Sequence, residues 1–526
     1  MKKKTILFTA LLLLIFVTGC AGKEKPEANL ADHMKNLFGN KPKIEQKERL
    51  DQWSPTMKLS DCAQEELVLP AAEAKAVPVT FTEEEKKDEW DSYTGGADAE
   101  YATAQADASA PDEVKRLISE YNDWVIENTD SEMKAAKERW DLYHAVDPDD
   151  FIALTPRVGM HLMRSDTSVF SYMTEIYCYN RDYEPDLRLL YGYTFDAQSG
   201  RELTLRDFIT DTDAMTDLIC QSLKITNSSY REEATNAFVA DAFRQRVKES
   251  LDGCRDDGLF AWTLDPAGFE FYFADPFFES EYLMHSVERA FVPFSLCRDL
   301  LFQDADVSYD HIVNIPFGYV EKLYGFRTLP GMKENGYYSA YLVHKSGQDY
   351  LYLSGYEETL VYRIEDQKPE YLTSVIGEPA NTEYSAYAIF PDPASFTMDY
   401  EACLVREMNE LSAQAYVGED GVPVYAELFR SPYFLEPMSV IEPFEAEVFT
   451  DEKDEEPEIR ELPQNTWLNF LRTDGQTFID LYMEGTGQNE QEEICRFYVT
   501  GDRESGFSVN GHPVDDVLNL KGWLEE

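Results

Sequence analysis

The sequence predicts an α+β fold: an antiparallel sheet with a helix pair in a middle domain, followed by a mainly β C-terminal region. Three observations predict it. Apolar and polar residues alternate as in strands over 158–205, two helical patterns follow over 215–251, and from residue 308 Tyr and Phe recur in short segments separated by turn residues. With 526 residues, 43% of them hydrophobic, the chain can bury a sizeable core. At roughly 150 residues per domain, this length suits two to four domains.

Shifts in composition and in apolar period mark the predicted segments along the chain. They are a signal peptide (1–19), an acidic tether or linker (20–110), a helical segment (111–150), an α+β ligand-binding domain (151–303), a β-rich domain (304–450), an acidic linker (451–463) and a small terminal β-unit (464–526).

The first twenty residues indicate where in the cell the protein is located. Lys2–Lys4 form a positively charged N-terminal region, and Ile6–Val17 is an apolar run too short to cross a bilayer. The two together are typical of a secretory signal peptide. Val17–Cys20 resembles the lipobox of bacterial lipoproteins, and the resemblance implies that Cys20 is acylated and tethers the chain to the outer face of the cytoplasmic membrane. An ordinary signal peptide that contains a cysteine, or an uncleaved N-terminal helix, would explain the same residues.

The charge of the chain restricts its partners. Acidic residues outnumber basic ones by 100 to 47, which gives a formal net charge of −53. We therefore expect neither nucleic acid nor anionic lipid as a partner, because phosphate binding requires a basic surface. A cationic protein or metal cations suit the negative electrostatic field of the chain better. The acidic composition could also serve only to keep the protein soluble.

The cysteines do not form a recognisable scaffold. If Cys20 is acylated, seven remain: Cys62, Cys178, Cys220, Cys254, Cys297, Cys403 and Cys495. Their spacings are wide, no Cys-x-x-Cys occurs and none lies near a histidine in sequence, so no zinc site is predicted. We predict that most are buried as small hydrophobic residues and, since seven is an odd number, that at least one thiol is unpaired.

The stretch 71–111 is rich in Ala, Glu, Asp, Lys, Ser and Thr and poor in large apolar residues. Such a composition buries too little surface to offset the entropy of ordering, so it predicts a flexible acidic linker. Val77–Phe81 could form one short strand within it.

Two helices are predicted after this linker. The first begins at Pro111, and the second is capped by Ser131 and ends at Asp147. Trp124 and Trp140 could stack on a sugar, but aromatic residues at helical spacing predict a core position.

The middle domain is predicted from its apolar periods and turn residues. The expected strands, turn, helices and hairpin are Ser168–Tyr179, Leu189–Phe195, the turn Asp196–Gly200, Glu202–Leu205, helices at Met215–Ile219 and Val239–Leu251, the hairpin Phe260–Phe273 and the strand Val287–Phe294.

This order of elements resembles the extracellular domain of RsiV-type anti-sigma factors, a domain of unknown function that also accompanies peptidoglycan deacetylases. The matching pieces are Phe195–Gly200, Leu203–Phe208, Gly268–Phe273 and Val292–Phe294, within residues 150–300. Members of the family sense lysozyme by binding it, so the resemblance implies a module that binds a protein or an envelope ligand.

The sequence also departs from the family. A cytoplasmic sigma-binding segment and a spanning helix are not found, so transmembrane signalling by that route is not expected. The paired histidines of a deacetylase are not found either, because the seven histidines are scattered. No lysozyme-contact residue can be matched by position, and the ligand-binding residues stay unassigned.

The C-terminal region predicts a β meander, either a sandwich or propeller-like blades. Its expected strands include Tyr337–His344, Tyr350–Leu353, Thr359–Ile364 and Tyr371–Ile376, and no repeated propeller signature accompanies them. The acidic run Asp451–Glu461 predicts a solvated linker before the terminal β-unit.

Searches for a catalytic or metal centre assign no residue. Among 100 acids any carboxylate spacing occurs, so a glycosidase pair has no specific signal. Calcium is the one candidate cofactor: Asp211–Asp217 and Asp147–Asp150 are rich in oxygen ligands, yet both lack the EF-hand glycine and the terminal glutamate. Asp211 is better explained as a helix N-cap. His161 and His344 lie in apparent strands and are predicted to be packed or surface residues.

We therefore predict a non-enzymatic, lipid-anchored binding protein of the cell envelope, whose ligand is a protein or cell-wall component and could be a cationic protein such as lysozyme. The alternative is an envelope glycan or peptidoglycan hydrolase that acts through unidentified carboxylates. A third reading is a purely structural envelope component.

Overall fold

A computed structural model of the protein describes residues 71–91, 95–146, 152–180, 189–226, 241–251, 260–273, 288–302, 305–324, 329–333, 338–355, 358–366, 368–380, 387–389, 392–403, 408–431, 437–450, 456–483, 493–502 and 506–519. All of these residues belong to one compact unit, Glu66–Glu526. Within them no helix has the length and apolar character needed to span a bilayer. The fold is α+β with a mainly β C-terminal region, as predicted.

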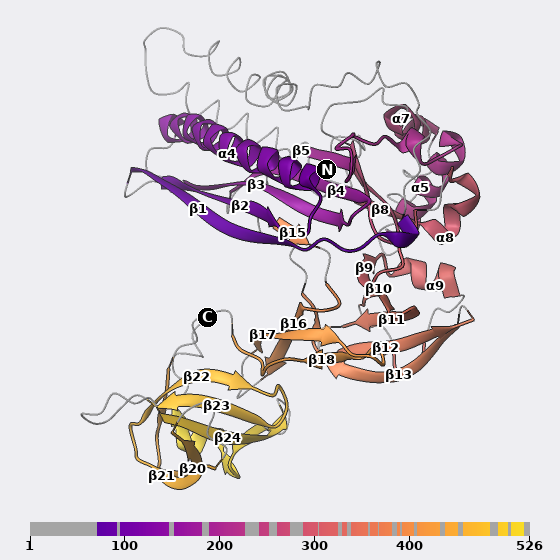
Figure 1. Ribbon diagram of the computed structural model, residues 1–526. Coiled ribbons are helices and arrows are strands. Elements are labelled where there is room, and N and C mark those ends of the chain that lie inside the picture. Colours follow the sequence, from indigo (N-terminus) through magenta and orange to yellow (C-terminus); the bar gives the residue numbers. More distant parts are fainter. Residues whose placement is uncertain are drawn as a thin grey trace, which may run out of the picture. The chain divides into compact units, whose positions relative to one another are not determined.

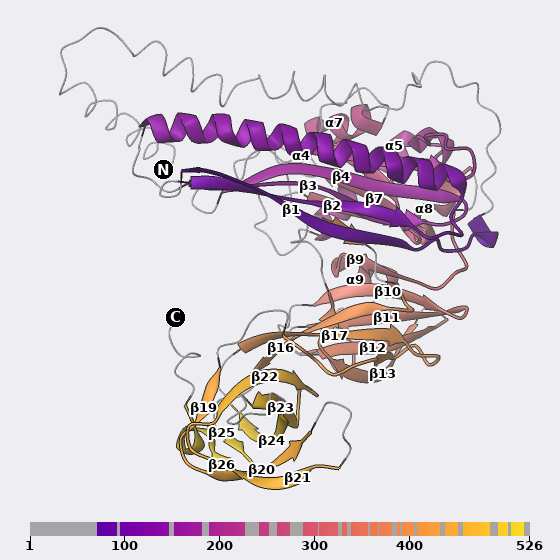
Figure 2. The same cartoon turned by 60° about the vertical axis from the view of Figure 1, so that its left-hand side comes forward.

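The first sheet carries one long helix along its face. Its strands, in spatial order, are β1 (Val79–Asp91), β2 (Gly95–Ala106), β3 (Ile152–Ser165), β4 (Val169–Asn180) and β5 (Leu189–Asp196), with β15 (Tyr387–Ile389) also paired to β3. Helix α4 (Asp112–Val146) connects β2 to β3, which are parallel, and runs along the sheet (Figures 1 and 2). The short helix η1 (Ala71–Glu73) precedes β1.

The prediction of a flexible linker over 71–110 is wrong for β1 and β2. Buried alanines of β2, among them Ala97 and Ala99, pack with Met133, Ala136 and Trp140 of α4. Alanine is small enough to lie under a helix, but it is a weak signal of burial in a sequence. Strand β1 is an edge strand of mostly exposed, charged residues, which discourages pairing with other chains.

The two helices predicted over 111–150 are one continuous helix, so Ser131 caps nothing. Polar residues near its middle bond to backbone carbonyls one turn earlier: Thr129 Oγ1 donates to Val125 O (2.8 Å) and Asn128 Nδ2 to Trp124 O (2.9 Å). These bonds satisfy the polar side chains within the helix, although bonds of this kind slightly destabilise a helix in general. Trp124 and Trp140 are buried core residues, as predicted.

A second layer contains the predicted helix pair. Its elements are η2 (Leu205–Asp207), α5 (Thr212–Thr226), α7 (Asp241–Leu251), β6 (Phe260–Leu264), β7 (Gly268–Phe273), β8 (Glu288–Pro293), α8 (Phe294–Cys297) and η4 (Arg298–Leu300). Strands β6, β7 and β8 form an antiparallel sheet whose side chains share one core with α5, α7 and the first sheet. The predicted turn at Asp196–Gly200 is present, and Gly200 has the positive φ of 68° that such a turn requires.

The β-rich region forms a sandwich, one of the two predicted alternatives. One sheet contains β9 (His311–Ile315), β10 (Ser339–Lys345), β11 (Gln348–Ser354), β12 (Glu358–Glu365) and β13 (Lys368–Ile376); the other contains β14 (Glu378–Pro379), β16 (Phe396–Cys403), β17 (Met408–Val417) and β18 (Pro423–Tyr425). Alternate residues of the sheet β9–β13 share a core with the sheet that contains β16 and β17. The remaining residues pack against α9 (Gly318–Tyr324) and Phe291 of β8.

The terminal β-unit is larger than predicted. It contains β19 (Met438–Val440), β20 (Phe444–Phe449), β21 (Glu458–Leu462), β22 (Trp467–Thr473), β23 (Phe478–Met483), β24 (Glu493–Asp502), β25 (Gly506–Val509), β26 (His512–Pro513), α10 (Val514–Val517) and β27 (Leu518–Asn519). The linker predicted over 451–463 is wrong for 458–462, because these residues pair with β20 as strand β21. Like β1, β21 is a charged edge strand, and its composition resembles that of a linker.

A buried ion pair joins β7 and β8 to β9. Glu270 is fully buried and accepts from Arg289 Nε (2.7 Å). The same guanidinium donates to both oxygens of Asn314, in the side chain and the backbone, at 2.7 Å each. Burial raises the pKa of Glu270, and the attraction of Arg289 opposes that rise. The pair therefore fixes β9, which carries a histidine of the candidate site.

Candidate functional site

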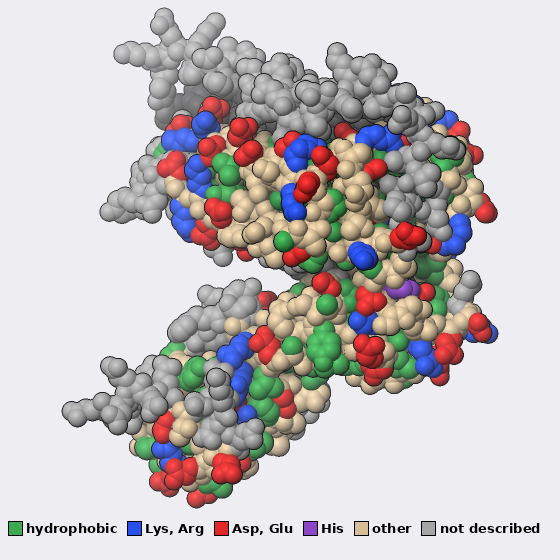
Figure 3. All heavy atoms as spheres, in the orientation of Figure 1, with side chains coloured by type: hydrophobic (Ala, Val, Ile, Leu, Met, Phe, Trp, Pro, Cys, Tyr) green, Lys and Arg blue, Asp and Glu red, His purple; other side chains and the backbone are tan. Residues whose placement is uncertain are grey.

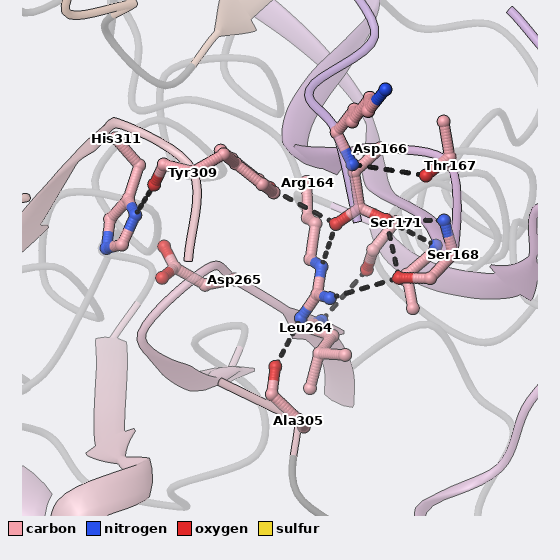
Figure 4. A network of polar contacts seen from close by, with 12 residues as sticks. Arg164, Asp166, Thr167, Ser168, Ser171, Leu264, Asp265, Ala305, Tyr309 and His311 are labelled. Atoms are coloured by element: carbon pink, nitrogen blue, oxygen red, sulfur yellow. Dashed lines mark hydrogen bonds and ion pairs between the residues drawn. The ribbon is translucent and has the colours of Figure 1, made fainter. Parts of the chain in front are cut away.

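A fully buried arginine lies at the end of β3. Arg164 Nε donates to Asp166 Oδ2 (2.7 Å), Nη1 to Ala305 O (2.9 Å) and Nη2 to Ser168 Oγ (3.4 Å), as Figure 4 shows. The pairing of β3 with β4 shifts register between Leu162 and Arg164. A bulge of this kind re-aims the side chains that follow it, and this one lies where the chain turns Arg164 inward.

The carboxylate of Asp166 is saturated with donors. Its Oδ1 accepts from the backbone N–H groups of Ser168 (2.7 Å) and Val169 (2.8 Å) and from Ser168 Oγ (2.6 Å), and Oδ2 accepts from Arg164 and from Tyr309 Oη (3.2 Å). Burial alone would raise the pKa of Asp166, but Arg164 and the Ser168 bonds outweigh it and hold that pKa below its usual range. We call Arg164, Asp166, Ser168, Tyr309 and the Ala305 carbonyl the Arg164 network.

A second buried carboxyl group beside this network behaves in the opposite way. Asp265, in the β6–β7 turn, accepts from the Ala267 N–H (2.8 Å) and is 2% exposed. Burial and the charge of Glu270 raise the pKa of Asp265 well above its usual range, so Asp265 tends to be protonated where Asp166 is ionised.

The network continues through the backbone to a histidine. The carbonyl of Tyr309 accepts from Nδ1 of His311 (2.9 Å), and Figure 4 shows His311 beside Tyr309 and Asp265. Because a carbonyl only accepts, the bond places a proton on Nδ1. Burial lowers the pKa of His311 to about 4, so at neutral pH its Nε2 carries a lone pair.

A cavity of about 510 Å³ opens next to His311. Its walls come from the β6–β7 turn, the end of β8 with α8, α9, and strands β9–β12. The lining residues include Pro266, Phe294, Leu296, Arg298, Asp306, His311, Lys322, Tyr324, Leu342, His344, Asp349, Tyr350 and Ile364. We refer to this space as the cavity.

Two histidines from neighbouring strands meet in the cavity. His311 and His344 are directly opposite each other in β9 and β10, and their rings stack with centroids 5.4 Å apart and planes 13° apart. Nδ1 of His344 bonds to Asp349 Oδ1 (2.7 Å), which raises the pKa of His344 against the opposing effect of burial. The pair therefore joins a neutral imidazole to one that protonates readily.

The predicted calcium ligands that the structure describes are engaged elsewhere. Asp211 is the N-cap of α5, as predicted, since its Oδ1 accepts from the Ala214 N–H (3.0 Å). Asp213 pairs with Lys248 (2.7 Å) and Asp217 with Arg244 (2.7 Å), both on α7. No group of three or more His, Cys, Asp or Glu side chains suited to a metal is found among the described residues.

The other residues named from the sequence are packed side chains. His161 lies in β3 and bonds to Glu175 Oε2 (3.1 Å), and His344 lies in β10 at the cavity. Cys178, Cys220, Cys297 and Cys495 are buried, as predicted, and burial raises the pKa of Cys297 to about 12, so its thiol stays protonated. Cys20 and the run Asp147–Asp150 lie outside the described residues.

The sequence did not reveal the cavity or the Arg164 network. Arg164 and Asp166 follow an apolar strand within a run of Ser and Thr, a pattern that usually indicates an exposed turn. Their partner Tyr309 is 143 residues from Asp166, and the opposition of His311 to His344 depends on strand register. Neither relation can be read without knowing which strands pair.

Comparison with known proteins finds only solved structures of low similarity. No family model and no curated protein matches the chain. Similar solved structures include a DUF3298 family protein from Bacteroides fragilis, with 14% identity and a TM-score of 0.31, covering 43% of this chain and 94% of that one. A DUF3298 family protein from Pseudomonas aeruginosa has 9% identity and a TM-score of 0.27, covering 46% and 99%. An exo-1,5-α-L-arabinanase from a bovine ruminal metagenomic library has 9% identity and a TM-score of 0.13, covering 68% and 97%. These likenesses assign no activity.

Proposed function

We propose that this chain is a lipid-anchored protein of the cell envelope that binds a protein or cell-wall ligand without converting it. The observation that carries the proposal is the cavity, whose volume of about 510 Å³ lies within the usual range of ligand sites. Its side chains Arg298 and Asp306, and His344 and Asp349, are paired with each other. Groups paired in this way suit a recognition surface, in which a few polar groups fix the orientation of a ligand.

The sequence supports the anchor and the choice of ligands. A lipobox-like Val17–Cys20 after an apolar signal suits acylation at Cys20. The net charge of −53 favours a cationic protein such as lysozyme, because opposite charge accelerates association. A small cell-wall fragment suits the volume of the cavity, about 510 Å³.

Binding is tested with the full chain against lysozyme and against muropeptides, in pull-down assays repeated across salt concentrations. We expect lysozyme capture that weakens as salt rises, or saturable muropeptide binding, or both. A cationic protein of similar size, such as cytochrome c, controls for charge alone. Capture of neither ligand above this control contradicts the proposal.

The anchor is tested separately with Cys20→Ser. We expect this variant to lose lipid labelling and to leave the membrane fraction. Unchanged labelling and membrane retention would refute acylation at Cys20.

A hydrolase is the second candidate function, and one observation favours it. His344 in the cavity has its Nδ1 held by Asp349 at 2.7 Å, which is the hydrogen bond that orients a general base. Turnover of peptidoglycan fragments that disappears in His344→Gln, but persists in the matched control His161→Gln outside the cavity, would establish this function in place of simple binding.

A further inference from the structure

We propose that the cavity binds an amphipathic oxyanion, a carboxylate or phosphate on a short apolar body, and that Lys322 recognises the anionic group. This inference rests on the proposed function and names the class of ligand that the cavity accepts.

The charges around the cavity balance when His344 is neutral and leave one positive charge over when His344 is protonated. Six lining side chains are ionisable groups other than tyrosine: Arg298, Asp306, His311, Lys322, His344 and Asp349. Arg298 forms an ion pair with Asp306, and His344 bonds to Asp349. His311 is neutral near pH 7. Both lining carboxylates are thus engaged with other partners, and the ammonium of Lys322 remains.

Lys322 has a neutral partner in the described part of the chain. Its Nζ donates to Gln221 Oε1 on α5 at 2.6 Å and lies 5.8 Å from the centre of the Tyr319 ring. An amide oxygen does not neutralise an ammonium, and desolvation lowers the pKa of Lys322. Lys322 is exposed, so water also solvates its ammonium, and an oxyanion in the cavity would add a charge-assisted hydrogen bond.

The other walls of the cavity suit an apolar body. Phe294, Leu296, Leu342 and Ile364 line it, and Tyr324 and Tyr350 add aromatic surface. Ligand sites are typically lined mainly by apolar side chains, with a few polar groups that fix orientation. The lining therefore favours an amphipathic anion over a free inorganic ion.

His344 provides a second contact for the anion. Its Nδ1 is occupied by Asp349, so its Nε2 is the nitrogen that remains for a ligand in the cavity. The bond to Asp349 favours the protonated ring, and in that form Nε2 donates. The neighbouring His311, with a neutral Nε2, adds no competing positive charge.

The experiment uses four probes of one shape that differ in charge: 3-phenylpropionate, 2-phenylethyl phosphate, 3-phenylpropanamide and 3-phenylpropylamine. Each is titrated into the full chain in nanodiscs, with empty nanodiscs as the blank, and Kd is measured by calorimetry. We expect at least one of the two oxyanions to bind roughly tenfold or more tightly than the amide, which is the scale of one hydrogen bond to a charged group. The amine is expected to bind most weakly, and the ratio of the two oxyanions decides between carboxylate and phosphate.

Variants then assign the contact. Lys322→Met removes the ammonium and leaves an apolar side chain of similar length. This variant should raise the Kd of the oxyanions about tenfold and leave the Kd of the amide unchanged. Lys322→Arg keeps the charge and should retain oxyanion binding, and Lys134→Met, an exposed lysine of α4, should change nothing. Equal binding of amide and oxyanion, an unchanged oxyanion Kd in Lys322→Met, or binding of no probe overturns the inference. If lysozyme or muropeptides still bind in that case, the proposed function survives the loss of this inference.

Discussion

The Arg164 network and the ion pairs of the cavity contain the same kinds of residue but differ in exposure. The side chains of Arg164 and Asp166 are 0% exposed, and hydrogen bonds reach both oxygens of the carboxylate. At the cavity the side chain of Asp349 is 66% exposed and that of Arg298 is 61% exposed. His311 connects the two sites, because it bonds to the carbonyl of Tyr309, a member of the Arg164 network, and lines the cavity.

The difference separates a structural role from a binding role. A buried pair must keep every partner, because an isolated charge in the interior has no water to solvate it. An exposed pair is screened by water and contributes little to stability, so its geometry can change when a ligand arrives. The Arg164 network is therefore expected to set the position of His311, and the cavity pairs are expected to respond to a ligand.

The largest expected effect is that of Arg164→Met. It leaves the Asp166 carboxylate buried without its countercharge, so the free energy of unfolding should fall by about 3–5 kcal/mol. Denaturant titration followed by circular dichroism measures this loss. Arg298→Met, which breaks the exposed pair with Asp306, is the matched control and should cost less than about 1 kcal/mol. Equal losses in the two variants would remove the distinction between the sites.

The next effect concerns pH and His311. Its pKa in the folded chain is about 4, against an ordinary value of 6.5. Between pH 4 and pH 6.5 the imidazole of His311 is protonated in the unfolded chain but neutral in the folded chain. The free energy of unfolding therefore falls as the pH falls from about 6.5 to about 4, by up to roughly 3 kcal/mol. The difference between wild type and His311→Asn isolates this contribution.

That difference is needed because other groups titrate in or near the same range. His344, Asp349 and Arg164 act electrostatically on His311, and the raised pKa values of Asp265 and Glu270 make stability rise as pH falls. Asp166, whose pKa is lowered, contributes stability that is lost only below its ordinary value of 3.8. Parallel pH profiles for wild type and His311→Asn over pH 4–6.5 would contradict the assignment to His311.

The same contrast explains how much of the molecule can be predicted from its sequence. Strands such as β4 and β10 and the helices α5 and α7 were predicted because they bury large apolar side chains with a clear period. Strands β1 and β21 were missed because edge strands are charged and expose most of their side chains. Strand β2 was missed because its buried face is alanine.

The candidate site could not be predicted for a different reason. Residues of the Arg164 network lie on β3, in the β3–β4 turn and in the segment before β9, and each is an ordinary residue in its own stretch. Their chemistry arises from contacts between segments more than 130 residues apart, as between Arg164 and Ala305 or Asp166 and Tyr309. Only the fold reveals which charges are buried and which remain available to a ligand.

A smaller effect is expected from Tyr309→Phe. The phenol donates one hydrogen bond to Asp166 at 3.2 Å, while the other donors to that carboxylate remain. The loss should therefore be near 1 kcal/mol in the free energy of unfolding, measured as for Arg164→Met. A loss as large as that of Arg164→Met would show that the phenol, and not the guanidinium, is the essential partner.

The smallest effect on stability is expected from Asp349→Asn. Because Asp349 is largely exposed, its removal should change the free energy of unfolding by less than about 1 kcal/mol. The pKa of His344 should nevertheless fall, since the hydrogen bond to Asp349 is the largest cause of its rise. NMR titration of the His344 imidazole measures this pKa directly. Asp310→Asn, which removes a weaker influence on the same ring, is the control and should shift the pKa less. If the two variants shift the pKa of His344 equally, His344 responds to the overall negative charge of the chain and not to Asp349. The cavity would then lack the ordered hydrogen-bond donor on which oxyanion recognition by His344 depends.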